Sequence, residues 1–297
     1  MGEVKENNSE NPGQVENPGQ SENLGQSRIL RIEYRTHAAL LLAAANVLYF
    51  IFLLVRAGAD PDNGTLISYG AMYDPLITGQ HEYYRFFTCC FLHFGITHLV
   101  NNMVNLCAVG SYLELYAGGV CTTAVYIISG IAGNVFSFAL RQAQLYIQSY
   151  AQLPVQHAGL RQLLEMLLPA QFKLQAELQA QGVYVISGGA SGACFGLLGA
   201  LIVTAAANHG QLGRIKLKNL IFMFVMSTAL GLADQNVDAA AHFGGFAAGA
   251  LTMAAIILSV KCLSGHGETS KKGSEDKEGI KDSKDNEDTS EEVKDQR

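Results

Sequence analysis

Six apolar segments, separated by more polar stretches, constrain this chain more than any other feature of its sequence. They cover residues 38–55, 91–113, 119–140, 189–207, 215–233 and 239–260. Each is near the length that crosses a hydrocarbon core of about 30 Å. Only 22 of the 236 residues from 28 to 263 are charged. The sequence therefore predicts an all-α, polytopic membrane protein, a bundle of six transmembrane helices.

The acidic balance of the chain belongs to its two ends. Residues 1–27 and 264–297 each carry a net charge of −4, whereas residues 28–263 carry +2. The first end repeats a six-residue Pro/Gly/Gln unit, and the second is rich in Lys, Asp, Glu and Ser. Because such compositions cannot build a core, we expect two disordered tails around one membrane domain at 28–263. Neither tail has the basic excess or the aromatic residues that nucleic-acid binding requires, so we expect no nucleic-acid partner.

The distribution of basic residues predicts the orientation in the membrane. Seven of them gather in short stretches beside the first, fourth, fifth and sixth segments: Arg28, Arg31, Arg35, Arg214, Lys216, Lys218 and Lys261. The positive-inside rule places these stretches, and with them both termini, in the cytoplasm. No cleavable signal or organelle-targeting sequence is visible, so we expect the first segment to act as its own insertion signal, in a bacterial inner membrane. The six cysteines show no Cys-x-x-Cys spacing, and we expect neither disulfides nor a metal site.

Two long loops fall on the outer side under this orientation. Residues 56–90 contain Tyr83-Tyr84-Arg85-Phe86-Phe87, a composition that suits the membrane interface. The insertion at 141–187 carries leucines at helical spacing between positions 160 and 168. It is interpreted either as an amphipathic interfacial helix or as a lid packed on the protein itself.

A run of small residues, Gly188-Gly189-Ala190-Ser191-Gly192, opens the fourth segment and carries one hydroxyl. Gly192 and Gly196 are four residues apart, so they share one helical face and allow another backbone to come close. Taken alone, the run is typical of a helix-packing motif whose serine hydrogen-bonds a neighbour.

Two further polar clusters favour a chemical role. His93, His98 and Asn102 enter the second segment, and Asp238 and His242 enter the sixth. The sixth also carries a ridge of small residues at four-residue spacing: Ala241, Gly245 and Gly249. The ridge of the fourth segment is its natural partner.

With the N-terminus inside, the second, fourth and sixth segments all run from outside to inside. Their polar residues lie near the N-terminal ends, and therefore at a similar depth in the outer part of the membrane. Polar groups in membrane spans are costly and usually face a cavity or one another. Ser191 and His242 on two closely packed helices are a hydroxyl nucleophile and an imidazole base, the parts of an acyl-transfer site.

The other polar groups fit supporting roles in the same site. Asn102, His98 and the Ser191 backbone N–H can donate to an oxyanion. Phe195, one turn beyond the serine, can lie against the His242 ring. Asp238 is interpreted as a gate or loop residue, which leaves a catalytic dyad without a third member.

In order and spacing, these clusters resemble the rhomboid family of intramembrane serine proteases. The shared motifs are His-x4-His-x3-Asn, Gly-x-Ser-Gly and Ala-His-x2-Gly-x3-Gly, and the likeness covers about 38–261. The resemblance implies Ser191 as nucleophile, His242 as base, and Asn102, His98 and Gly189 around the oxyanion. It also implies supporting roles for His93, near the site, and for Arg85, which stands with Tyr84 where the family has a Trp-Arg pair. The tyrosine and the longer 141–187 loop depart from the family pattern.

The resemblance implies hydrolysis of a peptide bond in or near a transmembrane segment of another membrane protein. The partners would be transmembrane protein substrates and the lipid bilayer, with no metal or organic cofactor. The substrate helix would have to unwind locally, because a helix hides its carbonyls in i→i−4 hydrogen bonds.

Three other functions remain as alternatives. The first is a catalytically inactive rhomboid-like scaffold that binds membrane proteins, which loss of Ser191 or His242 would mark; both residues are present. The second is a transporter, which is disfavoured because the spans contain almost no acidic residues. An adhesion or signalling protein acting through its tails would explain none of the polar groups within the membrane.

Overall fold

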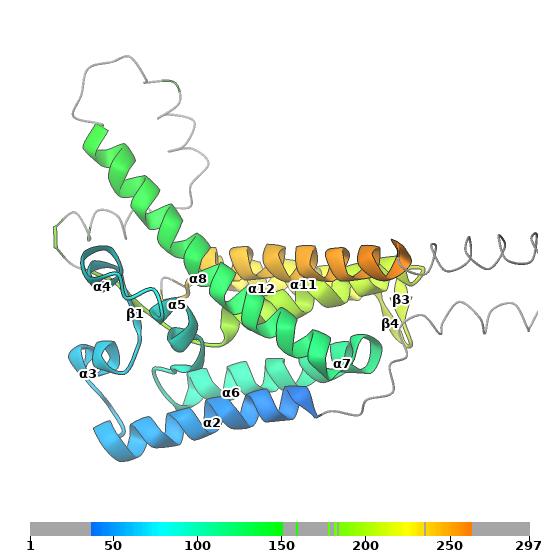
Figure 1. Ribbon diagram of the computed structural model, residues 1–297, viewed down its shortest axis with the longest axis horizontal. Coiled ribbons are helices and arrows are strands. Elements are labelled where there is room, and N and C mark those ends of the chain that lie inside the picture. The colour runs from blue at the N-terminus through cyan, green and yellow to red at the C-terminus, as the bar shows by residue number, and fades with distance from the viewer. Residues whose placement is uncertain are drawn as a thin grey trace, which may run out of the picture.

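The computed structural model describes residues 37–150, 159, 178, 181–182, 184–234 and 236–262. Most of them lie in helices that run side by side between two ends of the molecule (Figure 1). The bundle consists of α2 (Ala38–Ala57), α6 (Ile96–Asn105) continued by η2 (Leu106–Gly110) and α7 (Ser111–Ala117), α8 (Gly119–Tyr150), α11 (Ser191–Ala207), α12 (Leu217–Ala233) and a last helix, Ala239–Cys262. The predicted helical fold class is confirmed.

Within the described chain, three helices are long and apolar enough to cross a membrane: α2, residues Gly119–Tyr146 of α8, and the last helix. The helices α11 and α12 are apolar but have 17 residues each. The second predicted span is a succession of three segments, with the π-helical η2 between two α-helices. Six membrane crossings therefore remain a prediction.

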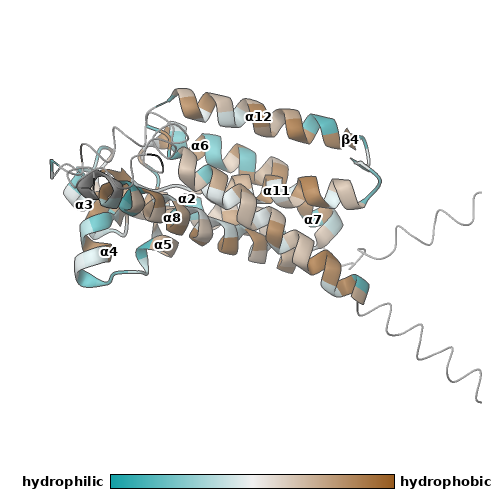
Figure 2. Ribbon diagram, turned by 90° about the horizontal axis from the view of Figure 1, so that it is seen from above, coloured by the Kyte–Doolittle hydropathy of each residue, from teal (hydrophilic) through white to brown (hydrophobic). Residues whose placement is uncertain are grey.

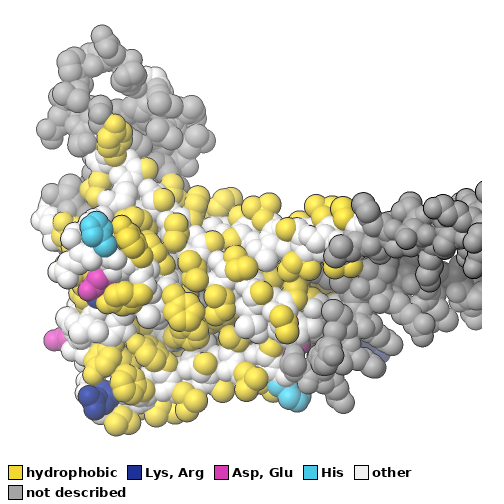
Figure 3. Space-filling model, in the orientation of Figure 1, with side chains coloured by type: hydrophobic (Ala, Val, Ile, Leu, Met, Phe, Trp, Pro, Cys, Tyr) yellow, Lys and Arg dark blue, Asp and Glu magenta, His cyan; other side chains and the backbone are white. Residues whose placement is uncertain are grey.

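The outer surface of the bundle is apolar. In Figure 3 hydrophobic side chains cover the face of the bundle, and the charged residues described there gather toward its ends. Figure 2 shows the same distribution, with hydrophobic residues along the helices and hydrophilic ones near α3 and α4. Large exposed apolar side chains occur along the length of the bundle: Leu41, Val104, Val120, Leu230 and Leu251. An apolar outer surface along the length of a helical bundle is typical of a protein that faces lipid.

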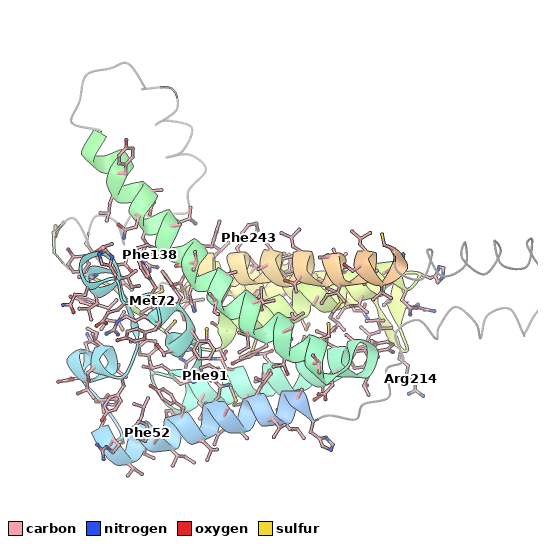
Figure 4. The ribbon with its side chains drawn as sticks, in the orientation of Figure 1. Phe52, Met72, Phe91, Phe138, Arg214 and Phe243 are labelled. Carbon is pink, nitrogen blue, oxygen red and sulfur yellow. The ribbon has the colours of Figure 1, made fainter. Side chains whose placement is uncertain are left out.

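The two ends of the bundle differ in structure. One end holds α3 (Asn63–Ser68), β1 (Met72–Tyr73), α4 (Asp74–Gln80), α5 (Arg85–Thr88) and η1 (Cys89–Phe91). The other holds the start of α2, the end of the last helix, and the hairpin of β3 (Gln211–Leu212) and β4 (Ile215–Lys216) (Figure 1). Figure 4 shows Arg214 of this hairpin far from Met72 and Phe138, which lie near the first end.

Glu114, in the first turn of α7, caps the start of α2. Its carboxylate oxygens accept hydrogen bonds from the backbone N–H groups of Ala38 (2.9 Å) and Ala39 (3.1 Å). The first N–H groups of a helix have no partner within it, and a carboxylate satisfies them and complements the helix dipole. The N-terminus of α2 and the helix α7 are therefore in contact.

Arg85 holds the first loop together from within. Its side chain is buried, and Nη1 donates to the carbonyls of Ile67 (2.6 Å) and Ala71 (2.8 Å). Its Nε donates to Glu82 Oε2 at 2.7 Å, and this hydrogen bond holds the pKa of the Glu82 carboxyl below its ordinary value. The neighbouring Tyr84 is exposed, and the Arg85 guanidinium lies 5.4 Å from the centroid of the Tyr84 ring.

The structure changes the predicted start of the 141–187 insertion. Helix α8 continues through position 141 to Tyr150 and projects beyond the rest of the bundle (Figure 1). No glycine or proline lies between 134 and 153, so nothing in the sequence ends the helix at 141. The leucine-rich stretch at 160–168, like the two tails, lies outside the described residues.

A short antiparallel ladder ties the end of the insertion to the first loop. Strand β2 (Ile186–Ser187) pairs with β1, with Met72 opposite Ser187. Two residues beyond β2, the backbone N–H of Gly189 donates to the Cys89 carbonyl at 2.8 Å. The segment that leads into α11 is thus fixed on the first loop before Ser191 begins the helix.

Candidate active site

The helix α11 and the last helix touch through their backbones. A Cβ atom on Gly245 would run into the carbonyl of Gly192, and one on Gly249 would run into the carbonyl of Gly196. The helix α8 closes on the same crossing, because a Cβ on Gly133 would lie 2.5 Å from the Ala241 carbonyl oxygen. Glycine is required at these positions because any side chain would push the helices apart.

A cavity of about 1100 Å³ opens at the N-terminal ends of these helices. Ser191, His242, His98, Asn102 and Gly189 all line it. They come from α11, the last helix, α6 and the segment after β2. The polar groups predicted to lie at one depth therefore share one cavity.

Ser191 is the first residue of α11, so the backbone N–H groups around it precede the first intrahelical hydrogen bonds. One turn later, the Phe195 ring stacks on the His242 ring, with centroids 4.3 Å apart and planes at 14°. On another side of the imidazole lies Gly231 of α12, where a Cβ would be 3.5 Å from His242 Nδ1. That nitrogen is buried and has no hydrogen-bond partner in the described chain. The imidazole is therefore oriented by packing.

Gly189 leaves an open space between His98 and Asn102. Its φ of +133° lies in the region that favours glycine. A Cβ there would stand 2.9 Å from His98 Nε2 and 3.6 Å from Asn102 Nδ2. Asn102 is buried, and its Nδ2 has no hydrogen-bond partner among the described residues. The site thus holds an unused amide donor beside a space that only glycine leaves free.

Packing holds His98 and Asn102 in place. The His98 ring stacks on Phe94, with centroids 5.9 Å apart, and meets the His93 ring edge to face at 5.1 Å. The thiol of Cys194 donates to the Asn102 carbonyl at 3.7 Å, which connects α6 to α11.

Three groups of predicted site residues lie outside the cavity. His93 is buried behind His98, with Nδ1 3.1 Å from the Phe91 carbonyl oxygen. Arg85 lies inside the first loop, as described above. Gly245 and Gly249 lie in the helix crossing below the cavity. His93 contacts His98, Gly245 and Gly249 contact α11, and Arg85 contacts the first loop.

Comparison with known proteins identifies the family of the chain. Residues 80–259 match the rhomboid domain family. The chain belongs to the rhomboid family. It is 30% identical over 218 residues to Rhomboid protease GluP of Bacillus subtilis (strain 168), covering 73% of this chain and 34% of GluP. It is 31% identical over 193 residues to RHOMBOID-like protein 1 of Arabidopsis thaliana, covering 64% of this chain and 39% of the relative.

The rhomboid relatives do not share one named activity. Inactive RHOMBOID-like protein 8 of Arabidopsis thaliana is 28% identical over 188 residues, covering 63% of this chain and 42% of the relative. The chain spans less than half the length of each of these three relatives. Family membership and the apolar helices make this rhomboid a multi-pass membrane protein.

Sequence reasoning missed a polar network beside the rhomboid cavity. Position 141 is the first residue of the predicted outer loop 141–187, but Arg141 is buried on α8 and paired with Asp74. Asp238 belongs to the same network through Ser137 and Ser187. One signal was present: an arginine followed by good helix formers, with no breaker that would end the preceding apolar helix.

Proposed function

We propose that this rhomboid is an intramembrane serine endopeptidase that uses Ser191 and His242 as a catalytic dyad. The observation that carries the proposal is the shared cavity. A helix-initial serine and an imidazole stacked on Phe195 line it together with Asn102, whose Nδ2 has no hydrogen-bond partner among the described residues. A hydroxyl, a base and an oxyanion donor are the groups that acyl transfer needs in one place.

In the proposed reaction the Ser191 hydroxyl attacks the scissile carbonyl and gives its proton to His242. The carbonyl oxygen becomes an oxyanion in the space beside Gly189, where Asn102 Nδ2, His98 and the Ser191 N–H donate to it. His242 then passes its proton to the leaving amine, and water hydrolyses the acyl-enzyme by the same route. Stacking and packing hold the imidazole in the role that a carboxylate, the third member, has in a catalytic triad.

The proposed substrates are transmembrane segments of other membrane proteins, cut near the outer face of the membrane. The described chain begins and ends at the β3–β4 end, and the cavity lies toward the other (Figure 1). With the basic residues of 208–218 inside, the cavity faces outward and both termini lie in the cytoplasm. Six crossings of a bacterial inner membrane complete this topology.

The test is to treat purified protein in detergent with a fluorophosphonate probe and to locate the adduct by mass spectrometry. Cleavage of a transmembrane reporter in liposomes is followed in parallel. We expect one adduct, on Ser191, and a cleaved reporter. An adduct without cleavage would retain the dyad and exclude that reporter as a substrate. Folded protein with neither adduct nor cleavage would contradict the proposal.

A catalytically inactive scaffold is the second candidate, favoured by the similarity to a relative named as inactive. It would bind transmembrane segments in the same cavity without cutting them. The absence of an adduct, together with capture of the intact reporter, would support it.

Replacing Asn102 by alanine is expected to lower the turnover number by about 10²–10³, because one oxyanion donor is lost. KM is expected to change little, since the amide acts on the developing charge. Initial rates of reporter cleavage over a substrate series measure both. The control is Asn105→Ala, one turn along the chain, whose amide already donates to the Asn101 carbonyl at 2.9 Å. Equal losses in the two variants would contradict the assignment.

A further inference from the structure

Arg141 is a buried cation shared by two carboxylates from different parts of the chain. Its Nε donates to Asp74 Oδ2 at 3.0 Å and its Nη2 to Asp74 Oδ1 at 2.9 Å, a two-pronged pairing. Its Nη1 lies 2.6 Å from Ser137 Oγ and 3.6 Å from Asp238 Oδ2. Asp74 begins α4 in the first loop, so α8 is fastened to that loop by charge.

Asp238, the second carboxylate, accepts hydrogen bonds from three parts of the chain. Its carboxylate accepts from the Ser137 hydroxyl at 2.7 Å, the Ser187 hydroxyl at 3.0 Å and the backbone N–H of Ala241 at 2.9 Å. Its own carbonyl accepts from the His242 N–H at 3.1 Å. Asp238 is therefore the N-cap of the helix that carries His242, and the cap is fastened to α8 and β2.

The network reaches both halves of the proposed site. Asp238 stands four residues before His242, and Ser187 stands two residues before Gly189. Ser187 also faces Met72 in the ladder, and Asp74 follows β1 directly. The helix that carries His242 and the segment from β2 to Gly189 are thus both linked to the guanidinium of Arg141.

Asp238 makes no hydrogen bond to the imidazole of His242 in the described part of the chain. His242 Nδ1 has no hydrogen-bond partner in the described part of the chain, whereas each Asp238 oxygen is bonded elsewhere. The positive end of the last helix dipole also lies at Asp238, the N-cap. The hydrogen-bonded link from Asp238 to His242 runs through the helix backbone, from the His242 N–H to the Asp238 carbonyl.

We propose that Asp238, held by Arg141, is a positioning residue that sets His242 and Gly189 in register with Ser191. The proposal rests on the dyad described above. Of the gate and loop roles considered for Asp238, it favours the loop role, since a residue bonded to three elements holds the loop in place.

The test compares Asp238→Asn, Asp238→Ala and Arg141→Lys in reporter cleavage, with rates normalised to the fraction of protein that fluorophosphonate labels at saturation. Asparagine keeps the size of the cap and removes the charge. We expect kcat per labelled molecule to fall by about tenfold to a hundredfold, the cost of a reacting group displaced by up to about 1 Å, with KM changed by less than about twofold. The labelling rate constant should fall in parallel.

The matched control is Asp62→Asn. Asp62 also caps a helix, accepting from the Thr65 N–H at 2.7 Å, but it is exposed and lies outside the network. It is expected to keep the wild-type kcat. If the Asp238 and Arg141 variants show a lower melting temperature but the wild-type kcat per labelled molecule, the network only stabilises the fold and the proposal is overturned. Asp238→Asn and Arg141→Lys decide the matter where Asp238→Ala does not fold.

Hydrogen exchange separates failure of this proposal from failure of the proposed function. In Asp238→Asn, amide exchange is expected to speed up in 239–242 and in 186–189, whether or not the wild type cleaves anything. A wild type without labelling or cleavage would refute the dyad, and faster exchange in both segments would still support the positioning role. Unchanged exchange in both segments would overturn it.

Discussion

Reporter cleavage by Ser191→Ala is expected to fall to the detection limit, a loss of roughly four to six orders of magnitude, as when soluble serine proteases lose their nucleophile. His242→Ala is expected to lose as much, because an unassisted hydroxyl is a weak nucleophile near neutral pH. The double variant is expected to be no worse than either single variant, since the two residues act as a unit. Cleavage of the transmembrane reporter in liposomes and labelling by the fluorophosphonate measure both losses.

The control is Ser259→Ala on the last helix, where an exposed hydroxyl donates to the Ala255 carbonyl at 2.9 Å. It is expected to cleave and label like the wild type. Melting temperatures of all variants in the same detergent show whether the fold is kept. Cleavage retained by folded Ser191→Ala would refute the proposed dyad. Losses that multiply in the double variant would mean that the two residues act independently.

Gly249→Val is expected to prevent the folded protein from accumulating. Its side chain would enter the space of the Gly196 carbonyl, and backbone on both helices leaves no rotamer that could move aside. Overpacking of cores costs typically about 1–3 kcal/mol, and we expect this substitution to reach or exceed the upper end. The measurements are the yield of monodisperse protein and the thermal midpoint in detergent.

Gly249→Ala adds one methyl group and is expected to give a smaller loss that can still be measured. Its control is Gly79→Ala in α4, where a Cβ would meet nothing within 4 Å. That variant is expected to be neutral or slightly stabilised, because alanine restricts the unfolded chain. A Gly249→Val protein with the wild-type thermal midpoint would show that α11 and the last helix are not in backbone contact.

The helix crossing and the cavity could be predicted from sequence because their signals are local. Gly192 and Gly196, like Gly245 and Gly249, repeat at four residues, which puts each pair on one helical face whatever the rest of the chain does. A common depth for Ser191 and His242 was expected from their places at the starts of apolar segments, and both line one cavity. Topology then brought together residues that lie about fifty positions apart.

The network around Arg141 had no such local signal. Arg141 and Asp74 are 67 residues apart, and neither carries a motif that names the other. The ladder of β1 and β2 has two residues in each strand, too few for any alternation to show. The approach of Gly133 to the last helix was also missed, because a single glycine in an apolar helix does not specify a neighbour. Each depends on long-range geometry that periodicity does not encode.

The length of α8 has a practical consequence for imaging and labelling this protein. At 1.5 Å per residue its 32 residues extend about 48 Å, some 18 Å more than a hydrocarbon core of about 30 Å. The Arg141–Asp74 pair and the Gln142 amide, which donates to Asp74 at 3.2 Å, anchor this extension at its base. A fiducial domain inserted, or a spin label attached, in the part of α8 beyond Gln142 is expected to lie outside a detergent micelle and to keep a fixed orientation relative to the buried helices.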